Sequence, residues 1–131
     1  PYLLLRWADA IVHHPAVLDA VQARYPMVLL TNGNASHQRM KIGTHDLERW
    51  FRHVVVSEEV GLVKPDPRIF DFALEHFDGI DRANIGYVGD SVTMDIGGAT
   101  AAGLYPILID PYDDHAGASF ARIRSLEELV R

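Results

Sequence analysis

Two aspartates, Asp90 and Asp95, lie five residues apart where an apolar run meets a polar turn. The run Ile85–Val88 is typical of a buried strand, so Asp90 is predicted at the strand tip and Asp95 near the start of the next helix. Carboxylate oxygens around a partly hydrated octahedral ion suit Mg²⁺. The helix dipole is a simpler explanation for Asp95, whereas a carboxylate at a buried strand tip needs a partner. The pair therefore predicts a candidate Mg²⁺ site.

Thr31 and Asn32 follow another apolar run, Met27–Leu30, in the same way. A hydroxyl, an amide side chain and backbone N–H groups at a helix start form a compact cradle for an anion. Because Thr and Asn are also good turn and capping residues, an ordinary capped turn is the alternative.

Lys64 is one of only two lysines in the chain and is followed by Pro65-Asp66-Pro67. The two prolines stiffen the loop and begin the next helix, which holds Lys64 near a helix amino terminus. The helix dipole disfavours a cation there, unless the lysine meets an anion. The alternative is an ordinary solvated lysine.

The elements that position these residues alternate between strands and helices. Short apolar runs predict strands over 27–30, 54–56, 85–88 and 106–109. Apolar spacing, first-turn prolines and a Ser125/Glu128 capping box predict helices near 15–25, 36–42, 46–51, 67–77, 94–103 and after 125. Segments 57–65 and 110–124 are expected as loops, and residues 1–14 fit no single element. This alternation predicts an α/β fold with a three-layer, Rossmann-like parallel sheet, whose ligands lie beyond the carboxyl ends of the strands.

Composition narrows the class of protein. The chain has 131 residues, 48% of them hydrophobic, which suits one globular domain. A net charge of −6 disfavours non-specific binding to nucleic acid or to an anionic membrane. The chain contains no cysteine, no run long enough to span a membrane and no visible signal peptide, so we expect a cytoplasmic protein. Its oligomeric state cannot be read from the sequence.

The order along the chain of the three turns that carry these polar residues is more informative than any single turn. Thr31-Asn32, Lys64 and Asp90…Asp95, each after a successive strand, resemble the second, third and fourth motifs of the haloacid dehalogenase superfamily. The surrounding segments Leu29–Asn34, Ser57–Pro67 and Val88–Ser91 agree with this resemblance. The similarity extends over about 15–103, with a looser match at 126–129.

The resemblance implies a role for each matching residue. Thr31, Asn32 and Gly33 would hydrogen-bond the phosphoryl oxygens, and Lys64 would neutralise the phosphate and the aspartyl-phosphate intermediate. Asp90 would bind Mg²⁺ directly. Asp95 would hold a metal-bound water or orient its neighbours, including Lys64. Thr31, Asn32 and Lys64 are thus the expected catalytic residues, and Mg²⁺ the expected cofactor.

One departure from the family is clear. The first motif of the superfamily is a strand that ends in Asp-x-Asp, whose first aspartate is the nucleophile and whose second is the general acid and base. The chain contains no Asp-x-Asp. We therefore expect an incomplete core over 15–131 without its first strand and its cap, and 1–14 as a possible cap remnant or linker. Without this strand, we expect the facing backbone N–H and C=O groups of the strands that end at Thr31 and Asp90 to lack hydrogen-bond partners, which would leave open ladders in the sheet.

The expected function is that of a Mg²⁺-dependent phosphomonoester hydrolase acting on a small phosphorylated metabolite. The nucleophile lies outside this chain, so the 131 residues alone are expected to be inactive. Two alternatives remain: a non-catalytic module that binds phosphate or a protein, and a 2-haloacid dehalogenase. The dehalogenase is the weaker alternative, since those relatives lack the Gly-Asp-Ser form seen at Gly89-Asp90-Ser91.

Overall fold

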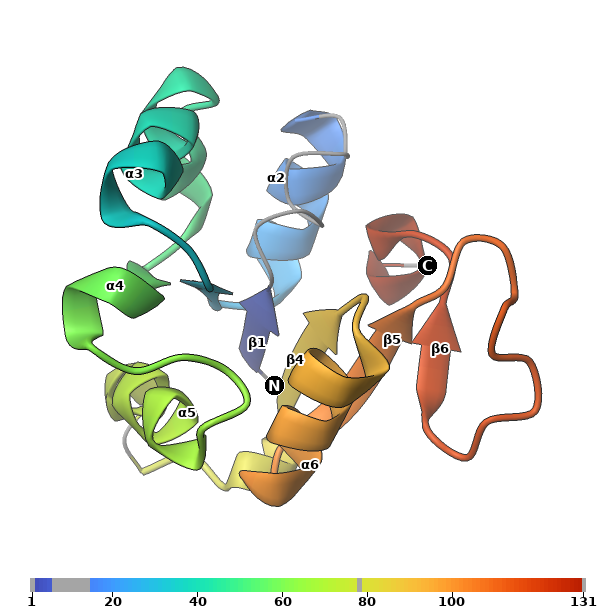
Figure 1. Cartoon of the computed structure of the whole chain (residues 1–131). Coiled ribbons are helices and arrows are strands. Elements are labelled where there is room, and N and C mark those ends of the chain that lie inside the picture. Colours follow the sequence, from blue (N-terminus) through green and yellow to red (C-terminus); the bar gives the residue numbers. More distant parts are fainter. Residues whose placement is uncertain (1, 6–14, 78, 131) are drawn as a thin grey trace.

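The computed structural model describes residues 2–5, 15–77 and 79–130, and its strands form one parallel sheet (Figure 1). The order across the six-stranded sheet is β3-β2-β1-β4-β5-β6. The strands are β1 (Tyr2–Leu5), β2 (Met27–Thr31), β3 (His53–Val56), β4 (Ile85–Gly89), β5 (Tyr105–Ile109) and β6 (Ala121–Ile123). The α/β fold and its parallel sheet, predicted from the alternating pattern, are confirmed.

Helices cover both faces of the sheet. The α-helices are α2 (Pro15–Arg24), α3 (Ala35–Thr44), α4 (Ser57–Val60), α5 (Pro67–Leu74) and α6 (Gly98–Ala101). Short 3₁₀ helices are η1 (Leu47–Trp50), η2 (Glu75–Phe77), η3 (Arg82–Asn84) and η5 (Leu126–Val130), and η4 (Val92–Gly97) is a π-helix. Figure 1 shows α2 and α3 on one side of the sheet and α5 and α6 on the other.

Strand β2 shows why the core has two halves. Successive side chains of a strand point to opposite faces, and all of β2 is buried. Leu29 packs into the cluster that contains Leu18 of α2, whereas Leu30 packs into the cluster that contains Phe70 of α5. A strand covered on both faces has no polar side to display, which is why it is a continuous apolar run.

The centre of the sheet differs from the expectation of an open gap. Tyr2–Leu5 lies between β2 and β4 and pairs with both in parallel, with Leu5 level with Leu29 and Val88. The expected open ladders between β2 and β4 are therefore wrong. Four consecutive apolar residues suit a buried parallel strand, and this one fills the gap. It carries no aspartate, so none of the strands that the structure describes carries the first motif of the superfamily.

Three smaller features also differ from the sequence-based expectations. The segment expected as a loop over 57–65 begins with the one-turn helix α4, which is followed by Gly61 in a left-handed conformation. The expected loop over 110–124 contains edge strand β6, which pairs with β5. The helix expected from residue 94 begins at Val92 with a π-turn. The expectation for 1–14 falls mostly on residues 1 and 6–14, which lie outside the described residues.

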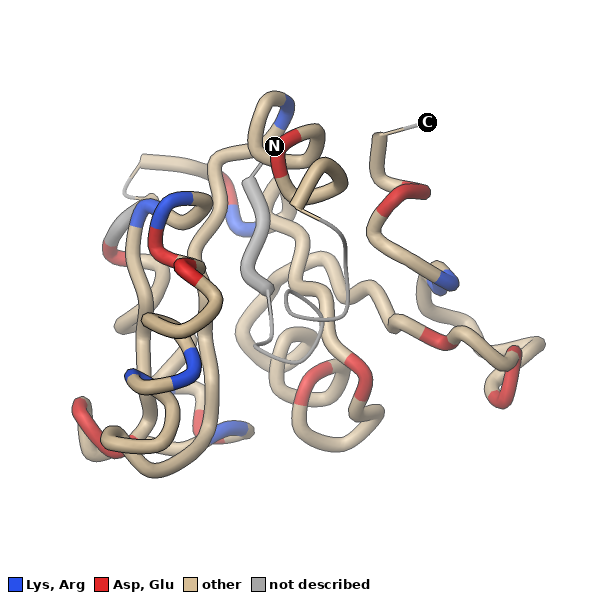
Figure 2. Tube along the Cα trace, turned by 90° about the horizontal axis from the view of Figure 1, so that it is seen from above, with Lys and Arg blue, Asp and Glu red and all other residues tan. Residues whose placement is uncertain are grey.

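Charged residues are mixed over the molecule. Figure 2 shows Lys and Arg positions interspersed with Asp and Glu positions, so no described face carries basic residues alone. Among the described residues, no helix is both long and apolar enough to cross a membrane.

Candidate active site

A buried ion pair lies at the centre of the candidate site. The ammonium nitrogen of Lys64 is 2.8 Å from Asp95 Oδ1, and the two residues are 3% and 0% exposed. The hydroxyl of Tyr87 donates to the same carboxylate oxygen at 2.9 Å and accepts from Lys64 Nζ at 2.9 Å. A charge removed from water is costly unless it is paired and hydrogen-bonded, and here both charges are. Lys64 is therefore not the solvated lysine of the alternative interpretation.

The other oxygen of Asp95 is held by the turn after β4. The backbone N–H groups of Asp90 and Ser91 donate to Asp95 Oδ2 at 3.1 and 3.0 Å. The π-turn of η4 brings the carboxylate there, since the N–H of Ile96 reaches back to the carbonyl of Ser91. Such π-turns are frequent at functional sites. Asp95 is thus bonded through both oxygens and is paired with Lys64.

Gly89 is the residue that makes room for this carboxylate. A Cβ at position 89 would lie 2.3 Å from Asp95 Cγ, closer than non-bonded carbon atoms approach. The Gly-Asp sequence therefore has a packing reason: the strand must end in glycine for the buried Asp95 to sit beneath it.

Asn32 holds the backbone of Lys64. Its Oδ1 accepts from the Lys64 N–H at 2.9 Å, and its Nδ2 donates to the Lys64 carbonyl at 3.3 Å. The peptide bond between Lys64 and Pro65 is cis. Asn32 therefore joins the turn after β2 to the lysine loop, which places the two predicted phosphate-binding segments side by side.

The turn after β2 is also held by hydrogen bonds to side chains of α3 and α4. Gln38, on α3 and 7% exposed, donates from Nε2 to Thr31 Oγ1 at 2.7 Å and to the Asn32 carbonyl at 3.3 Å. The N–H of Gly33 donates to Ser57 Oγ at 2.9 Å. The structure therefore brings together the predicted Thr31, Asn32 and Gly33 in one turn at the carboxyl edge of the sheet.

The start of α3 is less open to an anion than expected. The carboxylate of Glu58 accepts from the N–H of Ala35 at 3.1 Å and from Asn34 Nδ2 at 3.3 Å. Asn34 itself caps the helix by accepting from the N–H of His37. The N–H groups of Gly33 and Ala35 therefore both have partners within the protein, so the helix start is not the open anion cradle that the sequence predicted.

Asp90 is exposed at the tip of β4, beside the buried pair. Mg²⁺ is commonly bound by one or two carboxylates, substrate phosphate oxygens and several waters. The Asp90 carboxylate fits that requirement as a single protein ligand. The described residues contain no group of three or more His, Cys, Asp or Glu side chains arranged for a metal. Asp90 as direct ligand, and Asp95 as a second ligand through water, remain predictions.

Sequence reasoning did not identify Tyr87, Gln38, Ser57 or Glu58. Tyr87 lies in an apolar strand, where its ring packs edge-on against Phe70 at 5.3 Å between centroids. A phenol hydroxyl in a buried strand needs a partner, which is the signal that could have pointed to it. Nothing in the sequence pattern identifies Gln38, because a polar helix residue is normally solvated.

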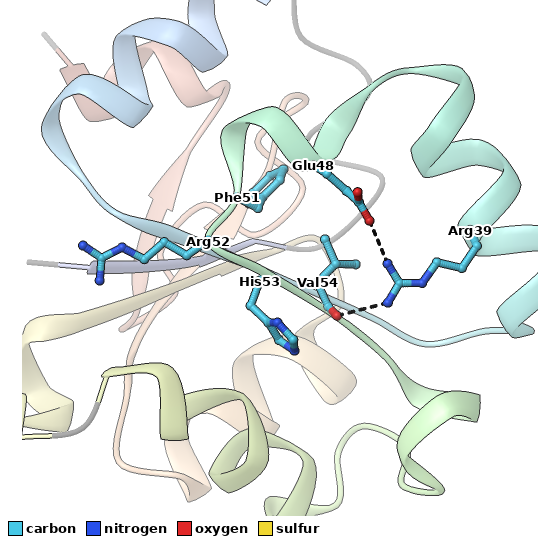
Figure 3. Close-up of a pocket in the computed structure, with 6 residues that line it drawn as sticks. All are labelled: Arg39, Glu48, Phe51, Arg52, His53 and Val54. Atoms are coloured by element: carbon cyan, nitrogen blue, oxygen red, sulfur yellow. Dashed lines mark hydrogen bonds and ion pairs between the residues drawn. The ribbon is translucent and has the colours of Figure 1, made fainter.

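A pocket of about 380 Å³ lies beside edge strand β3, lined by Arg39, Glu48, Phe51, Arg52, His53 and Val54 (Figure 3). Arg39 donates to Glu48 and to the carbonyl of Val54, while Arg52 points away from them. Arg39 also pairs with Glu59, and its hydrogen bond lowers the pKa of that carboxyl. The charge of Arg39 is therefore neutralised within the protein, and none of the predicted site residues lines this pocket.

Comparison of the chain with known proteins identifies its family. The family model of the haloacid dehalogenase-like hydrolases matches residues 4–103. The pyrimidine 5'-nucleotidase YjjG of Escherichia coli is 37% identical over 89 residues, which are 68% of this chain and 40% of that protein. The phosphoserine phosphatase of Thermus thermophilus is 37% identical over 107 residues, which are 79% of this chain and 42% of that protein.

The solved structures agree with the fold. The Bacillus subtilis protein YfnB, solved bound to magnesium, superposes with a TM-score of 0.78 at 27% identity, over 87% of this chain and 51% of that one. The chain thus spans 40% to 51% of the length of these three proteins. With a family match over residues 4–103 and the three motifs gathered at one edge of the sheet, the chain belongs to the haloacid dehalogenase-like hydrolases.

Proposed function

We propose that this chain supplies the phosphate-binding and metal-binding side of a Mg²⁺-dependent phosphomonoester hydrolase that acts on a small phosphorylated metabolite. The observation that carries the proposal is the buried Lys64–Asp95 pair beside the Thr31–Gly33 turn. A fixed cation and fixed donors need little reorganisation during reaction, which is how most phosphoryl-transfer catalysis is achieved. Relatives named as phosphatases and a nucleotidase support the same reaction class.

Magnesium is the proposed cofactor. Asp90 would hold the ion at the tip of β4, where its positive charge would help to neutralise the phosphate. The magnesium-bound state of YfnB supports this assignment by similarity. The residues that this chain contributes would bind and orient the phosphate: Thr31 and Asn32 from one side, and Lys64 from beneath.

The nucleophilic aspartate is not contained in this chain, which has no Asp-x-Asp. We therefore propose that residues 1–131 alone release no phosphate from p-nitrophenyl phosphate, although β1 fills the gap between β2 and β4 in their sheet. Mg²⁺-dependent turnover by these residues alone would contradict this part of the proposal.

The test of the function uses the full-length gene product and a panel of nucleotides, sugar phosphates and phosphoserine. We expect phosphate release that requires Mg²⁺ and stops with EDTA. Phosphate binding without turnover would favour the non-catalytic module instead. Chloride release from 2-chloropropionate would favour the dehalogenase.

A further inference from the structure

The amide of Gln38 has one possible orientation at the candidate site. Its nitrogen lies 3.3 Å from the backbone carbonyl oxygen of Asn32, which can only accept a hydrogen bond. The NH₂ end of the amide must therefore face the turn after β2. The same nitrogen lies 2.7 Å from Thr31 Oγ1.

This orientation determines what the Thr31 hydroxyl can do. A hydroxyl has one hydrogen to donate and lone pairs to accept with. Because Oγ1 accepts from Gln38, the hydrogen of Thr31 must be donated in another direction. Among the described residues, it is donated to the Asn32 carbonyl at 3.4 Å, well beyond the 2.5–3.0 Å range of ordinary O–H···O bonds. Such a long hydrogen bond is weak, so the hydroxyl hydrogen can turn to a better acceptor at little energetic cost.

We propose that Gln38 is a positioning residue that makes Thr31 a hydrogen-bond donor toward an anionic phosphoryl oxygen. The inference rests on the proposed function. Phosphoryl oxygens accept but do not donate, so a threonine that faced them with its lone pairs would repel them. Gln38 works against that arrangement by occupying one of the two lone pairs of Oγ1 from within the core, where Gln38 is 7% exposed.

The packing around Gln38 holds it in this role. A Cβ at position 33 would lie 3.0 Å from Gln38 Cγ, so the side chain runs directly beneath Gly33. Gly33 has φ +147°, a conformation that favours glycine. The turn and the amide therefore fit against each other, and the direction of the Thr31 hydroxyl follows from the position of α3.

The experiment is a double-mutant cycle in the full-length gene product. Four proteins are compared with p-nitrophenyl phosphate and Mg²⁺: wild type, Gln38→Met, Thr31→Val and the double variant. We expect Gln38→Met to lower kcat by roughly tenfold to a hundredfold, less than or equal to the loss from Thr31→Val. In the Thr31→Val background the Gln38→Met substitution should lower kcat no further, because there is no hydroxyl left to direct.

A second readout separates positioning from packing. Inorganic phosphate is expected to inhibit through the same groups, so its inhibition constant should rise in Gln38→Met and stay unchanged when the substitution is added to Thr31→Val. The matched control is Gln22→Met, the same substitution at a glutamine of α2 that also donates to a backbone carbonyl, that of Arg49. It should leave kcat and phosphate inhibition at the wild-type values.

The outcomes are distinct. If the losses from the two single variants multiply in the double variant, Gln38 only packs and the inference is overturned. Thermal unfolding monitors folding, and Gln38→Leu replaces Gln38→Met in the cycle if the latter does not fold. An active wild type with uncoupled variants rejects this inference alone, whereas a wild type that hydrolyses no phosphate ester rejects the proposed function and this inference together.

Discussion

At the scale of single residues, Asp90 and Lys64 are close together but differ in how far substitution would disturb the fold. Asp90 is exposed at a strand tip, whereas Lys64 is 3% exposed and paired with a fully buried carboxylate. Substitution of Asp90 changes an exposed side chain, whereas loss of the Lys64 side chain leaves the buried carboxylate of Asp95 without its cation. Variants at the two positions therefore need different controls.

For Asp90, we predict that Asp90→Asn in the full-length gene product abolishes Mg²⁺-dependent phosphatase activity. The amide is a far weaker Mg²⁺ ligand than the carboxylate, and the backbone N–H of Asp90 can still donate to Asp95. The thermal unfolding midpoint should stay close to the wild-type value. Asp46→Asn, at an exposed aspartate in a left-handed conformation that Asn also tolerates, is the matched control. Near-normal turnover by Asp90→Asn would show that the metal assignment is wrong.

For Lys64, we predict that Lys64→Ala lowers turnover by orders of magnitude and that Lys64→Arg does not fully restore it. A planar guanidinium cannot replace a compact ammonium in the space between Asp95 and Tyr87. The alanine variant should also lose roughly 3–5 kcal/mol in the free energy of unfolding, since Asp95 is left buried without its cation.

The two effects at Lys64 can be measured separately. The double variant Lys64→Met with Asp95→Asn removes both charges and should recover part of the lost stability in urea unfolding. Its turnover should stay as low as that of Lys64→Ala. Recovery of activity together with stability would show that Lys64 is needed only for folding.

At the scale of elements, the end of β4 and the π-turn of η4 form one unit. Gly89 ends the strand, the N–H groups of Asp90 and Ser91 follow, and η4 returns Asp95 to bond with them. The site depends on this close approach rather than on flexibility of the glycine, whose φ is not positive.

We predict that Gly89→Ala lowers both turnover and stability. The new Cβ would lie 2.3 Å from Asp95 Cγ, so the methyl group would push the carboxylate out of its position. The displaced carboxylate would no longer hold Lys64. Gly43→Ala is the matched control, since a Cβ there meets no atom within 4 Å and the residue lies in the last turn of α3. That control should raise the free energy of unfolding by up to about 1 kcal/mol. Equal unfolding midpoints and turnover in the Gly89→Ala variant and the wild type would contradict the packing argument.

At the scale of the whole molecule, the carboxyl edge of the sheet continues from the candidate site to β5 and β6. Asp110 follows β5 and accepts from the N–H groups of Asp114 and His115 and from Arg122 of β6. Burial by itself would raise the pKa of Asp110, but these hydrogen bonds outweigh it and hold the pKa below its ordinary value of 3.8. This carboxylate therefore links the edge strand to the loop between β5 and β6.

We predict that this link makes the free energy of unfolding depend on pH in the acidic range. The lowered pKa means that Asp110 stabilises the fold above about pH 4 and that this contribution is lost as the pH falls through its folded-state pKa. Asp110→Asn should therefore have a lower unfolding midpoint than the wild type near neutral pH and a smaller decrease between about pH 7 and about pH 3. Asp114→Asn, which changes an exposed carboxylate of the same loop, is the control. Parallel pH profiles for wild type and Asp110→Asn would contradict the assignment.

The sequence by itself determined the strands β2 to β5, the main helices and the residues that gather at the sheet edge, but it did not predict β1 or β6. Buried parallel strands must be continuously apolar, so Met27–Leu30 and Ile85–Val88 were identifiable from composition alone. Prolines at first turns marked the starts of α2 and α5 for the same local reason. Because parallel strands end at one edge, the order of strands and helices was enough to predict that the turns after them lie near each other.

Only the tertiary structure decided which partners these residues have. Tyr87 and Gln38 meet Lys64 and Thr31 across 23 and 7 residues of sequence, through contacts that no local pattern encodes. The central place of Tyr2–Leu5 likewise depends on the ladders offered by β2 and β4, not on its own four residues. Hydrophobic periodicity reports the immediate environment of a segment, whereas a buried hydrogen bond depends on two segments meeting. Most elements were therefore predictable from the chain, whereas β1, β6, α4 and the partners that position Lys64 and Thr31 were not.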